Sequence, residues 1–368
     1  MTQALRLALS AKRLLGGPCC REGGSAMTVI AIEEHWTTPQ LAAALNALSE
    51  ESRDDSLAFN EMGDNLARLE DIGDARIAAM DQQGIDMQII SLAPPATTPL
   101  APADAVSLSR DMNDLAAAAV RRHPSRLRAM STLPMADPAA VVVELERAAG
   151  LGFVGAMVYG RTGETALDDP CYYDLFAAAA ALGQPIFIHP QSPTRTIRDA
   201  AYAGFDPMTS RALSTFGWGW HLEAALAALR LILRGTFDRH PDLQIVLGHW
   251  GELLPFWSDR TDSVSRIAGL ERKTSDYLRS NVFITSSGMF NPALLQHSLA
   301  VTTVDHLLFS TDYPFLQPTR PEIQQFLTEF DTDDDREKFT SGNARRLFGI
   351  DATQDWGSVV DQDTGKAK

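Results

Sequence analysis

Short runs of β-branched and apolar residues alternate along the chain with Ala- and Leu-rich stretches whose apolar residues recur at helical spacing. This alternation is typical of βαβ units around a parallel sheet. The apolar runs predict eight strands, at Val29–Glu34, Met87–Ala93, Arg128–Pro134, Gly155–Tyr159, Pro185–His189, Gln244–His249, Val282–Ser286 and Leu307–Thr311. A count of eight favours an α/β fold of the closed (β/α)8 TIM-barrel type. An open doubly wound sheet has the same periodicity, so only the residues at the strand ends can distinguish it from a closed barrel.

The stretches between these runs predict helices, most of which end at Gly or Pro. They lie at Asp74–Gln83, Ala105–Arg122, Ala139–Gly150, Tyr172–Leu182, His221–Arg239 and Pro255–Leu270. The longest connection without a clear pattern is Pro190–Gly219, which holds Phe216 and Trp218 and is followed directly by Trp220. Because long connections inside compact domains are usually functional, we expect this segment to form a lid.

No linker divides the chain, so we expect a single barrel domain over residues 27–350. Residues 1–26 carry four basic residues and the single acid Glu22, unlike the acidic remainder. We expect this N-terminal extension to be disordered or processed, and residues 351–368 to be a polar C-terminal tail. Near that end, Thr332 is predicted to cap a helix whose first turn contains Asp333, Asp334 and Asp335.

Lys and Arg total 32 and Asp and Glu total 47, which gives a formal net charge of −15. Nucleic acid is therefore not expected as a partner, because phosphate binding requires a basic surface. The sequence has no run of the roughly 18 apolar residues that a membrane-spanning helix requires. Three cysteines, Cys19, Cys20 and Cys171, cannot build a disulfide framework and suit a reducing compartment. These features predict a cytoplasmic protein.

Carboxylates and imidazoles follow several of the predicted strands at their carboxyl ends, where barrels of this type have their active sites. The first strand ends in Glu33-Glu34-His35, the fifth in His189 and the sixth in His249, and the eighth runs into Asp312. Strand alternation places Glu33 and His35 on one face, which we assign to the barrel interior, and Glu34 on the other.

A converging set of carboxylates and imidazoles is what one divalent metal ion requires. We therefore predict that Glu33, His35, His189 and Asp312 bind one ion, Zn or Mn. The fourth predicted strand contains no Lys, so a carbamylated lysine bridging two metals has no source there. Surface or packing roles are expected for His123, His240, His297 and His306, whereas His221 is left undecided.

Six segments make the chain similar to a known family, the amidohydrolase-related decarboxylases, over about residues 28–350. They are Ala31–Trp36, Arg76–Ile85, Gly152–Ala156, Ile188–Pro190, Gly248–Glu252 and Phe309–Phe315. The resemblance is to γ-resorcylate, 2,3-dihydroxybenzoate and 5-carboxyvanillate decarboxylases. Aminocarboxymuconate semialdehyde decarboxylase has His-x-His where this chain has Glu33-x-His35, which favours the phenolic-acid branch.

The resemblance implies an amidohydrolase-type barrel and the same four metal-site residues. It also implies that His249 and Glu252 are the catalytic pair and that Arg260 and Phe315 contact substrate. From the residues alone, a first-turn helix acid is an alternative role for Glu252, and a surface position on the same helix is an alternative for Arg260. Together with Phe315, the tryptophans Trp250 and Trp218 would give an aromatic substrate a flat apolar slot.

These features predict non-oxidative, metal-dependent decarboxylation of an ortho-hydroxybenzoate, reversible with bicarbonate. The carboxylate and phenolate of such a substrate would chelate the ion, and Asp312 would deliver a proton to the ring. His249 and Glu252 would relay that proton. One alternative is a hydrolase of a lactone, ester or amide, in which the metal activates water. Another is a barrel that only binds a ligand. A homo-oligomer, a dimer or tetramer, is also expected.

Overall fold

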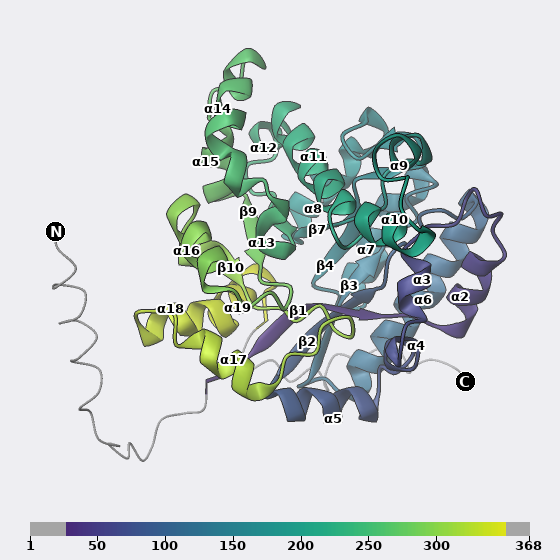
Figure 1. Ribbon diagram of the computed structural model, residues 1–368, viewed down its shortest axis with the longest axis horizontal. Coiled ribbons are helices and arrows are strands. Elements are labelled where there is room, and N and C mark those ends of the chain that lie inside the picture. The colour runs from purple at the N-terminus through teal and green to yellow at the C-terminus, as the bar shows by residue number, and fades with distance from the viewer. Residues whose placement is uncertain (1–26, 351–368) are drawn as a thin grey trace, which may run out of the picture.

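The computed structural model describes residues 27–350. The predicted N-terminal extension, 1–26, and the predicted tail, 351–368, lie outside the described residues. Eight strands occupy the centre of the molecule and the helices surround them (Figure 1). The strands are β1 (Ile30–Trp36), β2 (Met87–Leu92), β3 (Leu127–Thr132), β4 (Gly155–Tyr159), β7 (Ile186–His189), β8 (Ile245–Leu247), β9 (Val282–Thr285) and β10 (Leu307–Leu308).

The sheet follows the order of the chain, β1-β2-β3-β4-β7-β8-β9-β10, and every pairing in it is parallel. A short antiparallel hairpin, β5 (Arg161–Thr162) with β6 (Thr165–Ala166), lies outside this sheet. The eight predicted strands are therefore confirmed in number and position. Sequential order with parallel pairing throughout is the arrangement of a (β/α)8 barrel and not of a doubly wound sheet.

Between the first and last strands, β1 and β10, two separate contacts take the place of a regular ladder of backbone hydrogen bonds. The backbone N–H of His35 donates to the carbonyl of Tyr313 over 2.7 Å. The carboxylate of Glu34 accepts hydrogen bonds from both the backbone N–H and the hydroxyl of Thr311. Glu34 thus points away from the barrel interior, as alternation predicts, and joins the two edge strands.

Two apolar layers hold the barrel together. The inner layer fills the barrel with one or two side chains from each strand, and Ala344, Phe348 and Ile350 close its floor. The outer layer is larger and packs the other face of the strands against the surrounding helices. Burial on both faces explains why the strands read as continuous apolar runs in the sequence.

The segments labelled as helices are α2 (Pro39–Asn46), α3 (Leu57–Asn60), α4 (Asn65–Leu69), α5 (Asp74–Gln83), α6 (Pro102–Arg122), α7 (Pro138–Gly150), α8 (Tyr173–Leu182), α9 (Arg195–Ala201), α10 (Pro207–Ser214), α11 (Gly219–Leu233), α12 (Thr236–Arg239), α13 (His249–Glu252), α14 (Ser258–Ile267), α15 (Thr274–Ser280), α16 (Pro292–Val301), α17 (Arg320–Leu327), α18 (Asp333–Glu337) and α19 (Asn343–Leu347). Several begin with a capping Thr, Asp or Asn followed by Pro, as at α2, α7, α10 and α16. The predicted cap of α18 is confirmed, since the Thr332 hydroxyl accepts from the Asp335 N–H.

Four predicted helices, α5, α6, α7 and α8, agree with the structure to within three residues at each end. The prediction of one continuous helix over His221–Arg239 is wrong. Gly235 adopts a left-handed φ of 68° and separates two helices, α11 and α12. The predicted helix Pro255–Leu270 begins as a 3-10 turn at Pro255–Trp257, and α14 follows it.

The segment predicted as a patternless lid, Pro190–Gly219, contains two short helices, α9 and α10. Helix α9 buries none of its side chains, so it has no apolar stripe that a sequence pattern could indicate. Helix α10 is signalled only by its cap, the Asp206 carboxylate, which accepts from two backbone N–H groups. Both helices lie beside α3 at one side of the barrel (Figure 1).

Candidate metal centre and active site

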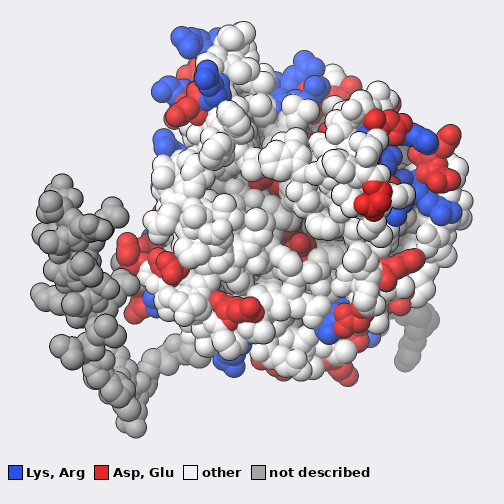
Figure 2. Space-filling model, viewed as in Figure 1, with Lys and Arg blue, Asp and Glu red and all other residues white. Residues whose placement is uncertain are grey.

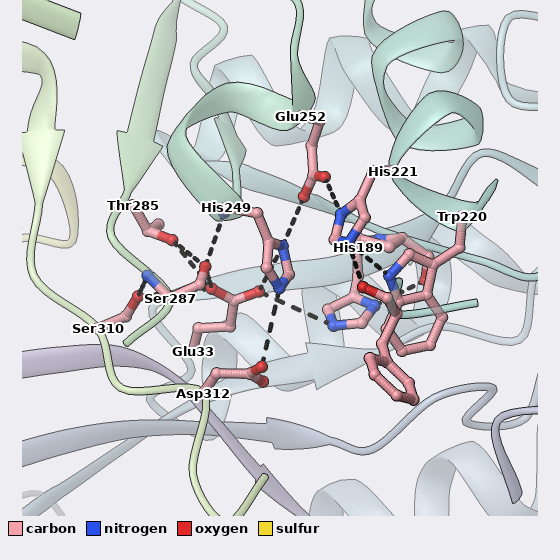
Figure 3. A network of polar contacts seen from close by, with 12 residues as sticks. Glu33, His189, Trp220, His221, His249, Glu252, Thr285, Ser287, Ser310 and Asp312 are labelled. Carbon is pink, nitrogen blue, oxygen red and sulfur yellow. Dashed lines mark hydrogen bonds and ion pairs between the residues drawn. The ribbon is translucent and has the colours of Figure 1, made fainter. Parts of the chain in front are cut away.

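Three predicted ligands from two strands converge at the carboxyl end of the barrel. Glu33 and His35 come from β1 and His189 ends β7, and one ligand atom of each lies within 4.8 Å of the others. All three side chains are buried. Figure 3 shows Glu33, His189 and Asp312 pointing toward one another. The barrel therefore brings together residues that lie far apart in the chain, as the strand-end pattern predicts.

Glu33 holds one carboxylate oxygen in hydrogen bonds and leaves the other open. Its Oε2 accepts from the hydroxyl of Thr285 over 2.9 Å and from the hydroxyl of Ser287. Its Oε1 is buried and has no hydrogen-bond partner among the described residues. Burial raises the pKa of this carboxyl, so its ionised form requires a cation nearby. An oriented, unpartnered oxygen of this kind fits a metal ligand.

The two imidazoles also present one ring nitrogen each. Nδ1 of His189 lies 2.7 Å from the carbonyl of Pro190 and must donate to it, which leaves Nε2 unprotonated and 3.8 Å from Oε1 of Glu33. Burial, together with His35 and His249, lowers the pKa of His189 to about 3, so the ring is neutral. Nε2 of His35 is buried and has no hydrogen-bond partner within residues 27–350. Two nitrogens and an oxygen facing one point fit a divalent ion.

Asp312 lies between this cluster and His249. Its Oδ1 is 3.3 Å from Nε2 of His35, and its Oδ2 is 3.7 Å from Nε2 of His249. Burial alone would raise the pKa of Asp312, but the neighbouring imidazoles of His249 and His35 hold it at about 2. The residue has a left-handed φ of 60°, which is unfavourable for a residue other than Gly and is common at functional sites. Asp312 thus contacts both the candidate metal cluster and His249.

The segment after β8 is labelled α13 but is a left-handed turn. Its four residues, from His249 to Glu252, have φ values of 46°, 57°, 84° and 56°. This turn brings Nδ1 of His249 to 2.8 Å from Oε1 of Glu252. Each residue other than Gly in this region costs about 1–2 kcal/mol, so the surrounding packing must hold the turn in place. Glu252 is therefore part of the site and does not act as a first-turn helix acid.

Gly248 allows the turn to approach the metal cluster closely. A Cβ atom at this position would lie 2.7 Å from Oε1 of Glu33 and 3.0 Å from Oε1 of Glu252. Any larger residue would therefore push apart the two carboxylates that the site uses. The backbone N–H of His249 donates to the hydroxyl of Ser287 over 2.7 Å, which fixes the turn to the segment after β9.

His221, which the sequence leaves undecided, belongs to the site. Its Nδ1 lies 2.6 Å from Oε2 of Glu252, so one carboxylate joins His221 and His249 (Figure 3). Burial alone would raise the pKa of Glu252, but the two histidines hold it at about 2. Burial alone would lower the pKa of His249, but the carboxylates of Glu252 and Glu33 raise it well above its usual value. These two carboxylates therefore favour the imidazolium form of His249.

A cavity of about 500 Å³ opens in front of these residues. Its walls are largely aromatic and aliphatic, and three polar residues, Ser56, Asn60 and Asn65, line it from the segment around α3 and α4. The predicted lid contributes Phe216 and Trp218, and Trp220 follows them at the start of α11. In Figure 2 charged side chains gather mainly at the periphery of this face, and its centre is mostly uncharged. The cavity suits a flat apolar ring with a polar edge.

Of the predicted substrate residues, Trp218 and Phe315 line the cavity, whereas Trp250 and Arg260 do not. The Trp250 indole is buried, donates its N–H to the carbonyl of Met289 over 2.8 Å and stacks on Phe339. Arg260 is exposed on α14, which extends away from the barrel (Figure 1). The sequence does not single out Ser287 or the residues around α3, because only tertiary contacts bring them to the site.

A second cluster, made of His221, His249 and Glu252, also has ligand atoms within 4.8 Å of one another. Its two carboxylate oxygens already accept from the two Nδ1 atoms, so this cluster is a closed hydrogen-bond network.

In the described part of the chain, no helix is both long and apolar enough to cross a membrane. A buried acid and two histidines around one point, at the mouth of a (β/α)8 barrel, define the class of metal-dependent barrel enzymes.

The chain belongs to the amidohydrolase family, which it matches over residues 32–350. It is 34% identical over 339 residues to a γ-resorcylate decarboxylase from Polaromonas sp., covering 87% of this chain and 98% of that relative. It also resembles the crystal structure of 5-carboxyvanillate decarboxylase from Sphingomonas paucimobilis, with a TM-score of 0.80, 32% identity and coverage of 89% of this chain and all of that one.

A third similar protein bears on the metal. The dihydroxybenzoic acid decarboxylase from Polaromonas sp. has a TM-score of 0.74 and 32% identity, with 88% of this chain and 97% of that one covered. That structure contains manganese and an inhibitor, 2-nitroresorcinol. The predicted kinship with hydroxybenzoate decarboxylases is thereby confirmed.

Proposed function

We propose that this protein is a carboxy-lyase that removes carbon dioxide, without oxidation, from an ortho-hydroxy aromatic carboxylic acid. The observation that carries the proposal is the position of Asp312, between the metal cluster and His249 at the end of an aromatic-walled cavity. The relatives named above are decarboxylases of hydroxybenzoates. The reaction is reversible with bicarbonate, because an enzyme lowers the barrier in both directions.

Glu33, His35, His189 and Asp312 would hold one divalent ion, manganese or zinc. When bound, that ion would supply positive charge for the substrate carboxylate and its neighbouring phenolate. Manganese has the direct support of the Polaromonas structure, whereas zinc rests on the chemistry of mixed nitrogen and oxygen ligands.

Protonation of the ring is the step that this chain's own residues must supply. Nε2 of His249 lies 3.7 Å from Oδ2 of Asp312, so His249 can supply a proton to this carboxylate. Because the pKa of His249 is raised and that of Asp312 is about 2, this transfer is uphill and is coupled to delivery of the proton to the ring. Asp312 then transfers the proton to the ring carbon that bears the substrate carboxylate. The bond between that carbon and the carboxylate breaks, its electron pair returns to the ring, and carbon dioxide leaves. Glu252 stabilises the imidazolium before the transfer.

Product analysis tests the proposal. Purified, manganese-loaded protein is incubated with a panel of hydroxybenzoates, and released carbon dioxide and the corresponding phenol are measured together. We expect equal amounts of both products from an ortho-hydroxybenzoate, and little of either from the His189→Ala variant. Hydrolysis of a lactone, ester or amide with no carbon dioxide from any hydroxybenzoate would replace the proposal with the hydrolase alternative.

Two further proposals concern the protein in the cell. We propose a cytoplasmic location, which the sparse cysteines support, and assembly into a homo-oligomer. The exposed Phe256, Trp257 and Phe205 side chains support the second proposal, because large apolar residues on a surface commonly mark contacts between chains. Sedimentation analysis would test the oligomer, and a dimer or tetramer is the expected result.

A further inference from the structure

The segment around α3 places an unused amide on the cavity wall. Asn60 lines the cavity, only 8% of its surface is exposed, and its side chain makes no hydrogen bond within residues 27–350. Ser56, one helical turn earlier, also lines the cavity, and its hydroxyl is buried without a partner in the same part of the chain. Buried polar groups are normally hydrogen-bonded, so two unpartnered groups on one wall point to a ligand that completes them.

This wall is held rigidly by the lid. Oδ1 of Asp54 accepts from the hydroxyl of Ser192 over 2.8 Å and from the backbone N–H of Ser56 over 2.9 Å. Asp55 forms ion pairs with Arg198 of α9 and Arg211 of α10. These contacts fix the start of α3 from two sides, so Asn60 is positioned before any ligand arrives.

Two more contacts fix the end of α3. The ring of Phe59 packs edge-on against Phe216 of the lid, with 4.8 Å between the ring centroids. The amide of Asn65 donates to the carbonyl of Phe59 over 3.1 Å, so Asn65 is already engaged and Asn60 is not. Asn60 is therefore the amide on this wall that remains available to a ligand.

The chemistry of the wall indicates a neutral polar group. An amide and a hydroxyl can each donate and accept a hydrogen bond, which matches a hydroxyl group. The described residues that line the cavity include no Lys or Arg, so a second carboxylate on the substrate would have no counter-charge there.

We propose that Asn60, assisted by Ser56, binds a second ring hydroxyl of the substrate, besides the one next to the carboxylate. This specificity role rests on the proposed decarboxylase function. A substrate without that hydroxyl fills the cavity but leaves the Asn60 amide without a partner, and so binds more weakly than one that carries it.

The test compares 2-hydroxybenzoate with the four dihydroxybenzoates that also carry the 2-hydroxyl, using manganese-loaded protein. We expect the wild type to prefer one dihydroxybenzoate, and Asn60→Leu to reduce that preference, measured as the ratio of kcat/KM values, about tenfold. Asn46→Leu, the same change at an exposed site on α2, is the matched control and should keep the wild-type ratio. Asn60→Ala provides a second variant if the leucine disturbs folding.

Binding measured by calorimetry separates this inference from the proposed function. If no hydroxybenzoate releases carbon dioxide but Asn60→Leu still selectively weakens dihydroxybenzoate binding, the decarboxylase proposal fails and the role of Asn60 stands. If the ratio of affinities and the ratio of kcat/KM values are both the same in wild type and Asn60 variants, the role of Asn60 is refuted. Failure of the wild type to bind any of the five acids refutes it as well.

Discussion

Glu34 and Thr311 join the first and last strands of the barrel through two hydrogen bonds to one carboxylate. The Thr311 N–H donates to Oε1 over 2.9 Å and its hydroxyl donates to Oε2 over 2.7 Å. Glu34 lies between the predicted ligands Glu33 and His35, and Thr311 precedes Asp312. The contact that closes the barrel therefore also holds Glu33 and His35 close to Asp312.

Replacing Glu34 with Gln should destabilise the protein by about 2 kcal/mol, because one amide oxygen cannot accept both bonds and the amide N–H₂ faces a donor. The midpoint of urea unfolding measures this loss. Glu51→Gln is the control, since the Glu51 side chain is 83% exposed and should contribute close to nothing. Equal midpoints for the two variants would show that the seam does not depend on this carboxylate.

Metal content should follow the predicted ligands. We expect one divalent ion per chain by elemental analysis, and a decrease in occupancy of about tenfold or more in Glu33→Gln and His189→Ala. Activity should fall in parallel. His123→Ala, at a site remote from the cluster, should retain the ion. Two ions per chain, or a fully active protein without any, would contradict the single-metal site.

The pH dependence of stability should reveal the ion pairs of Asp168, which is buried and bonded to Arg230 and Arg234 at the end of α11. Burial alone would raise the pKa of Asp168, but the two arginines lower it below its ordinary value of 3.8. The folded state therefore prefers the carboxylate, so its contribution is complete above about pH 4 and is lost as the pH falls through the lowered pKa.

We expect Asp168→Asn to cost about 1–2 kcal/mol at pH 7, a modest value because both arginines are about half exposed. Urea unfolding from pH 7 to pH 3 measures the difference between wild type and variant. That difference should stay constant down to about pH 4 and begin to decrease between pH 4 and pH 3. A constant difference across this range would mean that packing, not charge, stabilises Asp168.

The strand-end residues could be predicted because two local rules determine them. Alternation along β1 places Glu33 and His35 on one face, and parallel strands in sequential order bring their carboxyl ends to the same rim. His189 and Asp312 then meet β1 without further information. The bulge between Ala31 and Glu34 shifts the alternation by one residue, because Ile30 and Ile32 already belong to the inner apolar layer. The sequence pattern does not indicate this bulge, but the pair Glu33 and His35 lies beyond the shift and keeps a common face.

The rest of the site depends on contacts that no local pattern carries. The left-handed turn after β8 directs the Trp250 ring into the core beside Phe339, although its neighbour His249 faces the cavity. His221 reaches Glu252 only because α11 packs against that turn. The Asn60 wall comes from a four-residue helix, too short to produce a periodic signal.

His221 should act as a positioning residue for Glu252. Removing its ring in His221→Ala leaves Glu252 with one partner, so we expect kcat to fall about tenfold with a smaller change in KM. His221→Asn can still place an N–H near Oε2 of Glu252 and should recover part of the loss. If the alanine and asparagine variants lose the same activity, the hydrogen bond from His221 to Glu252 does not account for the loss of kcat.

Asp312 should deliver the proton that replaces the carboxylate, because it is the acidic group between His249 and the metal cluster. In heavy water the wild type should place one deuterium on the ring carbon that lost the carboxylate. Asp312→Asn keeps an oxygen for the metal but has no acidic proton, so kcat should fall by about 10²–10⁴-fold while KM changes little. Metal content measured on the same samples separates loss of the proton donor from loss of the ion, with Glu33→Gln as the reference for the latter. A metal-loaded Asp312→Asn enzyme with wild-type kcat, or a product without deuterium at that carbon, would assign the proton to another group.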